Sequence, residues 1–358
     1  PSTGSVTDAS YSPANNLGYI TTREIRWGCF AGLPERRVVM SVPLRPGDVK
    51  ADLQELGSVW SSMLTQFFRD GELDEACSVE VPCPHCGHTE VEQVFRLKGF
   101  RHGTCVSCET VYVSPRLTDE CIEELYSNEY YNTLYITSVL PMFKQRTRLL
   151  GRGKFDQLVA LRGGGPAGRV LDIGAGVGEI LEVFRDEGWA THAIEMNETA
   201  VDWLSERGHT EVFHGRLQDY EQDNHNFDVI MAWGVVEHVL DADDFLTRVH
   251  GLLAPGGLFV SEVPHAQSLL VDVVCRSGLD PGRIVMGEQH IKLYSVGAYT
   301  ELHERNGLAL AHMQTNGLDV STLLEMDKSV VPDELLAAMQ QSIDARSYGD
   351  LLRGFWSR

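Results

Sequence analysis

Four cysteines are spaced as ligands of a metal ion. Cys83 and Cys86 form the pair CPHC, and after eighteen intervening residues Cys105 and Cys108 form CVSC. Two such pairs place four thiolates on two tight turns, from which they reach tetrahedral positions about 2.3 Å from Zn²⁺. Four thiolates complete the coordination shell, so we expect a structural zinc ribbon rather than a catalytic metal. The alternatives are two disulfides, which need an oxidising compartment, or substitution of one ligand by a nearby histidine (His85, His88 or His102).

A glycine-rich turn follows a buried strand in the stretch RVLDIGAGVGEI, residues 169–180. The apolar residues before the turn are typical of a buried strand, and a helical pattern begins at Glu179. Gly174, Gly176 and Gly178 permit positive φ angles and close approach of the backbone to a ligand. The helix N-terminus that follows offers free N–H groups. We therefore expect a nucleotide-like ligand at this turn.

Three kinds of site compete for the turn. A phosphate-binding P-loop needs GxxxxGK followed by Ser or Thr, and no lysine is present in this stretch. A dinucleotide-binding turn reads GxGxxG, whereas this chain has GxGxG. The third kind, a methyl-donor site, agrees with residues farther along the chain.

The segment resembles the first motif of class I S-adenosylmethionine-dependent methyltransferases. The resemblance implies that Asp172, at the end of the first strand, lies near the amino-acid end of the cofactor. Glu195, seventeen residues after Gly178, closes the second strand, and a carboxylate there can accept hydrogen bonds from both ribose hydroxyls. Farther on, FDVIMAWGVVEHVLDADDFLTRVHGLLAPGGLFVSEVP is similar to the fourth and fifth motifs. The resemblance covers about residues 120–358.

Family position implies further contacts with the cofactor. These are Met196 beside the adenine, Arg216 and Leu217 along its edge, Trp233 near the methyl-bearing sulfur, and Tyr131 with its neighbour Tyr130 as a cap. Each also fits a plain structural role, which is a core position for the apolar and aromatic residues and a solvated surface charge for the arginine.

Methyl transfer to a hydroxyl or to a C–H acid requires removal of a proton, a task that suits histidine near neutral pH. His238 follows Glu237 just beyond the fourth strand, over the expected position of the methyl group. His290 lies in GEQHIKLYS, after the fifth strand. Which of the two is the base stays open, and the alternative for His238 is a first-turn helix residue held by backbone contacts.

Two subfamilies show where this chain departs from known patterns. The ubiquinone-pathway O-methyltransferases resemble it around Glu237 and His238, but their additional metal-binding carboxylate one turn earlier is replaced here by Gly234. We therefore do not expect a catalytic metal. The sugar C-methyltransferases share an N-terminal zinc ribbon, usually with more widely separated CxxC pairs. Their later motif reads HEH. The corresponding residues of this chain are Glu288, Gln289 and His290, so the last histidine is kept, whereas Gln289 cannot act as a base.

The elements that would hold these residues alternate along the chain. We expect strands at 169–173, 191–195, 211–213, 227–233 and 258–263, with helical stretches between them. This alternation predicts an α/β fold with a doubly wound, mostly parallel sheet that binds its ligand at the carboxyl ends of the strands. We expect four regions: an extension with strands and one amphipathic helix (1–78), the zinc ribbon (79–116), a helical connector or lid (117–165) and the methyltransferase domain (166–358).

The 358-residue chain has a formal charge of −21. Its field repels phosphate backbones and anionic lipids, so we expect neither nucleic acid nor a membrane as a partner. The sequence has no apolar run of 18 residues and no leader pattern, which indicates a cytoplasmic protein. The amphipathic helix of the extension would pack either on the rest of the chain or on a second copy, so a homodimer stays open.

Together these patterns predict S-adenosylmethionine-dependent methylation of a small biosynthetic intermediate, with oxygen as the acceptor atom and a histidine as general base. C-methylation of a nucleotide-linked sugar and a non-catalytic cofactor-binding module are the alternatives. Methylation of RNA is a further one, but the acidic charge counts against it. The sequence after the fourth strand also reads WGVVEH, with no Asn-Pro-Pro-Tyr motif.

Overall fold

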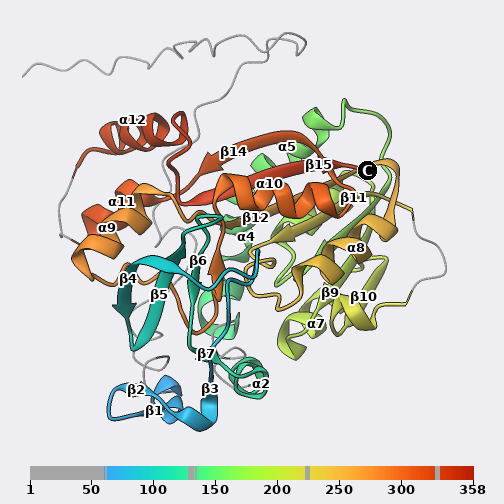
Figure 1. Cartoon of the computed structure of the whole chain (residues 1–358). Helices are drawn as coiled ribbons and strands as arrows, with labels where there is room; N and C mark the ends of the chain where they lie inside the picture. Colours follow the sequence, from blue (N-terminus) through green and yellow to red (C-terminus); the bar gives the residue numbers. More distant parts are fainter. Residues whose placement is uncertain (1–59, 61–62, 128–132, 134, 222–225, 327–330) are drawn as a thin grey trace, which may run out of the picture. The chain divides into compact units, whose positions relative to one another are not determined.

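The computed structural model describes residues 60, 63–127, 133, 135–221, 226–326 and 331–358, all within one structural unit, Pro43–Arg358 (Figure 1). Its largest sheet has the strand order β10-β9-β8-β11-β12-β15-β14. The parallel strands are β8 (Arg169–Ile173), β9 (Ala190–Glu195), β10 (Glu211–His214), β11 (Phe227–Trp233) and β12 (Leu253–Pro264). The strand β15 (Leu351–Ser357) runs antiparallel to β12 and to β14 (Ala309–Asn316). The expected α/β fold with a mostly parallel sheet is confirmed.

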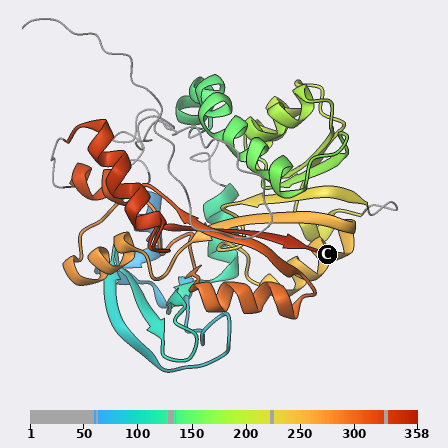
Figure 2. The same cartoon turned by 90° about the horizontal axis from the view of Figure 1, so that it is seen from above.

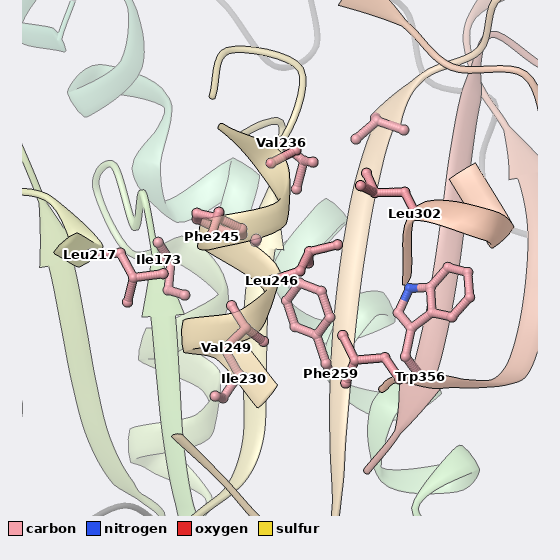
Figure 3. Packing of buried hydrophobic residues seen from close by; sticks show 14 of the residues in the cluster. Ile173, Leu217, Ile230, Val236, Phe245, Leu246, Val249, Phe259, Leu302 and Trp356 are labelled. Carbon is pink, nitrogen blue, oxygen red and sulfur yellow. The ribbon is translucent and has the colours of Figure 1, made fainter. Parts of the chain in front are cut away.

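Helices cover both faces of this sheet (Figure 2). The helices α5 (Arg152–Leu161), α6 (Glu179–Asp186) and α7 (Glu198–Ser205) bury side chains against one face. On the other face lie α8 (Ala242–Leu252) and α10 (Val296–Arg305). In that second core, Phe245 and Leu246 of α8 pack with Phe259 and Trp356 of the sheet (Figure 3). Burial of apolar surface on both faces explains why the strands read as continuous apolar runs.

Polar side chains begin several of these helices. Asn197 accepts a hydrogen bond from Ala200 N at the start of α7, and Ser295 accepts one from Ala298 N at the start of α10. Such caps satisfy N–H groups that the helix itself cannot pair. They also fix where the loops from the strand ends meet the helices, and these loops carry the residues of interest.

The cysteine-rich region forms a second sheet with strands β4 (Val91–Leu97), β5 (Phe100–Cys105) and β6 (Val111–Val113). A fourth strand, β13 (Lys292–Leu293), comes from the methyltransferase part of the sequence and pairs antiparallel with β6. The two regions that the sequence separates therefore share a sheet.

Smaller elements complete the described chain. They are η2 (Thr65–Phe67), β1 (Phe68–Arg69), β2 (Glu72–Leu73), η3 (Glu75–Cys77), β3 (Ser78–Val79), β7 (Arg116–Leu117), α2 (Asp119–Ser127), η4 (Tyr135–Val139), η5 (Leu140–Met142), α4 (Phe143–Arg146), η6 (Thr147–Gly151), η7 (Leu217–Asp219), α9 (Leu269–Ser277), α11 (Asp319–Met326) and α12 (Asp333–Asp344). No helix among the described residues is long and apolar enough to cross a bilayer.

One expectation differs from the structure at the amino end. The stretch 48–71 carries the apolar pattern of the expected amphipathic helix, but its last residues are not helical, because Phe68–Arg69 and Glu72–Leu73 pair as a hairpin. Asp70 and Gly71, at its turn, have positive φ angles. Most of the helix's expected length lies outside the described residues. Of its apolar residues that the structure describes, Trp60, Leu64 and Phe67 are buried.

Candidate functional site

The glycine turn lies at the carboxyl end of β8, beside the carboxyl end of β11. The chain continues from β8 to one side of the sheet and later returns to the other side, and doubly wound sheets bind ligands at this reversal. Gly174, Gly176 and Gly178 have φ angles of 68°, 56° and 72°, a region that other residues rarely adopt. A Cβ at Gly178 would also lie 2.5 Å from Leu204 Cδ2. These glycines are therefore required by the backbone geometry.

Glu195 closes β9 and faces the turn. Its Oε2 accepts a hydrogen bond from Gly176 N at 2.7 Å, and its Oε1 accepts from Met196 N and Asn197 N, both at 2.8 Å. Burial raises the pKa of Glu195, and these three backbone N–H groups oppose the rise. The carboxylate of Glu195 is thus fixed beside the glycine turn, and its remaining lone pairs can accept further hydrogen bonds.

Buried polar atoms without a hydrogen-bond partner among the described residues gather at this edge of the sheet. They include Asp172 Oδ1 at the end of β8 and Trp233 Nε1 at the end of β11. Burial, and then the charge of Glu179, raise the pKa of Asp172 well above its usual value. Unsatisfied buried groups are rare in native proteins. Their position therefore suits a polar ligand that supplies the missing partners.

The other residues expected around the cofactor are less uniform. Met196 is 49% exposed beside Glu195, which suits a contact with a ligand. Leu217 is buried in the core, and Arg216 forms an ion pair with Glu123 of α2 at 2.7 Å. Leu217 therefore has a core position and Arg216 a surface position, which are the structural alternatives that we gave for these two residues. Tyr131, with Tyr130, lies outside the described residues.

The sequence reasoning missed Lys154. This residue of α5 is a buried cation at the carboxyl edge of the sheet: its Nζ lies 3.7 Å from the centre of the Trp233 ring and 3.2 Å from Glu262 Oε1. Arg353 of β15 also pairs with Glu262, so two cations share one carboxylate. Although burial opposes it, these cations lower the pKa of Glu262 to about 2. A lysine in an amphipathic helix reads as a solvated residue, and only tertiary packing reveals its position.

Glu237, His238 and His290 form one cluster beyond the end of β11. The Nε2 atoms of His238 and His290 lie 3.9 Å and 4.0 Å from Glu237 Oε1, and the two imidazole rings are 4.9 Å apart. The structure thus brings together the two histidines between which the sequence left the choice open. It also supports a role for His290 despite the change of the surrounding motif.

Hydrogen bonds set the orientation of both imidazoles. His238 Nδ1 donates to Gln289 O at 3.0 Å, and His290 Nδ1 donates to Ile284 O at 2.5 Å. Because a carbonyl only accepts, Nδ1 carries the proton in each ring and Nε2 is the basic nitrogen turned toward Glu237.

Burial controls the charges of the cluster. It raises the pKa of Glu237 to about 8, and together with the nearby His290 it lowers the pKa of His238 to about 3. At neutral pH this carboxyl therefore holds a proton and His238 is neutral. A proton on either imidazole would favour the ionised form of Glu237, so the protonation states of the three side chains depend on one another.

The same three side chains could also hold a metal ion. Their ligand atoms all lie within 4.8 Å of one another, and Glu237 Oε2 is buried without a partner among the described residues. The ring hydrogen bonds through Nδ1 are the kind that orient metal-bound histidines. His290 thus supplies a ligand where Gly234 cannot. The two imidazoles and the carboxylate therefore fit a divalent cation, although the sequence led us to expect no catalytic metal.

The four cysteines converge as their spacing predicted. All four Sγ atoms lie within 4.8 Å of one another, with Cys83 and Cys108 3.5 Å apart and Cys86 and Cys105 3.6 Å apart. A disulfide needs about 2.05 Å, whereas the edge of a tetrahedron around Zn²⁺ is about 3.8 Å at the usual Zn–S distance. The geometry therefore fits a metal site and not two disulfides.

The strand order, with the glycine turn after β8 and the Glu237, His238 and His290 cluster beyond β11, is that of a Rossmann-like fold. Residues 140–313 match the family model described as "Methyltransferase domain". Residues 140–313 are thus similar to methyltransferase domains, and the strand order around them agrees with the Rossmann-like fold of class I S-adenosylmethionine-dependent methyltransferases.

Curated relatives match only part of the chain. A ubiquinone biosynthesis O-methyltransferase from Bradyrhizobium sp. (strain ORS 278) is 36% identical over 96 residues, which is 26% of this chain and 38% of the relative. A probable S-adenosylmethionine-dependent methyltransferase from Mycolicibacterium smegmatis is 26% identical over 144 residues, or 39% of this chain and 52% of the relative. The chain thus spans well under two thirds of the length of these relatives.

Solved structures resemble the chain more distantly. A geranyl diphosphate C-methyltransferase from Streptomyces coelicolor A3(2) has a TM-score of 0.42 and 16% identity, covering 59% of this chain and 77% of that one. A putative sarcosine dimethylglycine methyltransferase from Galdieria sulphuraria has a TM-score of 0.40 and 14% identity, covering 57% and 84%.

Proposed function

We propose that the protein transfers a methyl group from S-adenosylmethionine to an oxygen atom of a small-molecule acceptor. The observation that carries this proposal is the position of the Glu237, His238 and His290 cluster, because Glu237 and His238 lie on the loop after β11 whose Val235 packs against Gly174 of the glycine turn. The similarity to an O-methyltransferase of ubiquinone biosynthesis supports oxygen as the acceptor atom.

Residues at the carboxyl edge of the sheet suit the three parts of the cofactor. Glu195 would accept hydrogen bonds from the ribose hydroxyls, and Asp172 would pair with the amino group through its unpartnered Oδ1. Lys154 would bind the carboxylate of the amino-acid end, because it is a largely buried cation that shares Glu262 with Arg353. When bound, S-adenosylmethionine supplies the activated methyl group.

A histidine of the cluster would act as general base. Each Nε2 is the basic nitrogen of its ring, and the two Nε2 atoms lie 3.9 Å and 4.0 Å from Glu237 Oε1. The hydroxyl of the acceptor would donate its proton to Nε2 as the oxygen attacks the methyl carbon in line with the departing sulfur. The carbonyl partners of Nδ1 would hold the ring in place during this step.

A second mode of activation is favoured by the donor set itself. Two imidazoles and one carboxylate are a common ligand set for a divalent cation with open coordination positions. In that mode the three side chains would hold the cation, whose charge lowers the pKa of an acceptor hydroxyl. Activity that survives a chelator favours the histidine base, and activity that the chelator abolishes and added Mg²⁺ or Mn²⁺ restores favours the metal.

We further propose that Cys83, Cys86, Cys105 and Cys108 bind a structural Zn²⁺, since four thiolates leave no open coordination position. The acidic charge supports a small-molecule acceptor rather than a nucleic acid.

The first test is calorimetric titration with S-adenosylhomocysteine. Glu195→Ala should weaken binding about tenfold, the scale of a hydrogen bond to a charged group. A panel of phenols, catechols and hydroxy acids with methyl-labelled S-adenosylmethionine then tests transfer to oxygen. No binding by folded protein would refute the proposal, and labelled product on carbon or nitrogen would refute the assignment of oxygen.

A further inference from the structure

His238 and His290, the two histidines proposed as base, lie on two loops outside the central sheet. His238 follows β11, and His290 lies in the segment 284–293 that leads into β13. Two hydrogen bonds join these loops. His238 Nδ1 donates to Gln289 O at 3.0 Å, and Lys292 Nζ donates to Val239 O at 2.7 Å. Neither bond anchors the pair to the rest of the molecule, so another part of the fold must set their position.

That anchor is the sheet of the cysteine module. The segment 284–293 extends it through the pairing of β13 with β6, and Val113 N donates to Ile291 O at 3.2 Å. At the other end of the segment, Ile284 and Val285 are buried in one cluster with Phe95 of β4. Both ends of the segment thus contact the small sheet, and the adjoining Tyr294 also bonds to Pro264 and Ala266 at the end of β12.

The middle of the segment 284–293 also packs against other parts of the fold. A Cβ at Gly287 would lie 2.5 Å from Phe100 Cβ, so the backbone packs directly on β5. Next to it, Glu288 is 1% exposed and its Oε1 accepts a hydrogen bond from Trp60 Nε1 at 2.5 Å, a contact across 228 residues. Glu288 therefore does not join the histidines, and it serves as the attachment point of their loop.

We propose that the cysteine module, together with Trp60 of the extension that packs on it, positions the acceptor-activating histidines, with Trp60 and Lys292 as the two positioning residues. This inference rests on the proposed function only for the role of the histidines. Its physical reason is that a displacement of about 1 Å between reacting groups can cost a hundredfold in rate. The positions of the two histidine loops therefore depend on their contacts with the rest of the fold.

Trp60→Phe tests the first contact, because it removes the N–H donor and keeps an aromatic ring in the cluster with Phe100 and Leu125. We expect hydrogen exchange in 284–293 to rise at least tenfold, and the ¹⁵N spectrum of His290 to change from a pure Nδ1–H tautomer to a mixture. The affinity for S-adenosylhomocysteine should stay within about twofold. Glu288→Gln keeps an acceptor oxygen for Trp60 and should match the wild type in all three readouts.

Lys292→Met tests the second contact and should change the His238 spectrum in the same way, with thermal melting as the check on folding. If Lys292→Met does not fold, Trp60→Phe still decides the proposal. Unchanged exchange and tautomer in Trp60→Phe would overturn it, as would an equal effect of Glu288→Gln. Absence of S-adenosylhomocysteine binding in every form would refute the proposed function alone, because exchange and spectra need no cofactor.

Discussion

At the scale of single residues, the sequence predicts chemistry best where backbone geometry forces the residue type. The three glycines of the turn all have positive φ, and Glu195 faces them as the motif implied. Lys154 illustrates the opposite case. Nothing in its local sequence distinguishes it from a solvated lysine, and its role depends on Trp233 and Glu262, which lie 79 and 108 positions away.

Lys154→Met should weaken S-adenosylhomocysteine binding between about tenfold and a hundredfold, the range for a hydrogen bond between charged groups. Binding of 5′-methylthioadenosine, which lacks the amino-acid part, should change by less than about twofold. Calorimetric titration of both ligands measures the difference, and Lys154→Arg, which keeps the charge, is the matched control. An equal loss for both ligands would show that the lysine acts through general stability.

His290→Gln and His238→Gln separate the roles of the two histidines. The residue that acts as base should lose at least a hundredfold in the rate of methyl transfer when replaced, the usual contribution of a general base. Its partner should lose less, and both variants should keep wild-type affinity for S-adenosylhomocysteine. Single-turnover rates with labelled cofactor provide the measurement. Full activity in both variants would exclude the cluster from the chemistry.

At the scale of elements, strands predicted from apolar runs agree closely with the structure. Those at 169–173 and 227–233 have the observed bounds of β8 and β11. The sequence did not predict β14 and β15, because β14 is largely exposed and alternates poorly, while β15 is a short apolar run at the end of the chain. It also missed β13, a strand of two residues whose identity comes only from its partner β6.

The end of α12 gives a prediction of pH dependence. Burial raises the pKa of Asp344 to about 7, although Gln340 donates a hydrogen bond to it. An unfolded aspartate titrates near 3.9, so between about pH 4 and pH 7 the folded state binds more protons than the unfolded state. Its stability must therefore fall as the pH rises through this window.

Asp344→Asn should remove this dependence and raise the melting temperature at pH 8 by about 2 °C or more, with little change at pH 4. Thermal denaturation of both proteins across that range is the measurement, and Asp333→Asn at the opposite end of the helix is the control. Identical pH profiles for wild type and Asp344→Asn would contradict the assignment.

At the scale of the whole molecule, the sequence indicated separate regions and the structure joins them. The cysteine spacing predicted a metal module, and the convergence of the four thiols agrees with it. That this module takes a strand from beyond β12 could not be predicted, because the contact joins β6 to residues about 180 positions away and leaves no periodic signal.

Removal of the metal should reveal this connection between the regions. We expect the purified protein to contain about one zinc per chain, and a chelator to release it with loss of exchange protection in β4, β5 and β6. Since β13 shares their sheet, protection should also fall in 284–293, whereas β8, β9 and β11 should keep theirs because the two cores of the central sheet do not include the cysteine module strands. Exchange measured by mass spectrometry, with Cys275→Ser as a control outside the metal site, distinguishes the regions. A zinc-free protein that kept full protection in β4–β6 would mean that packing alone holds the module together.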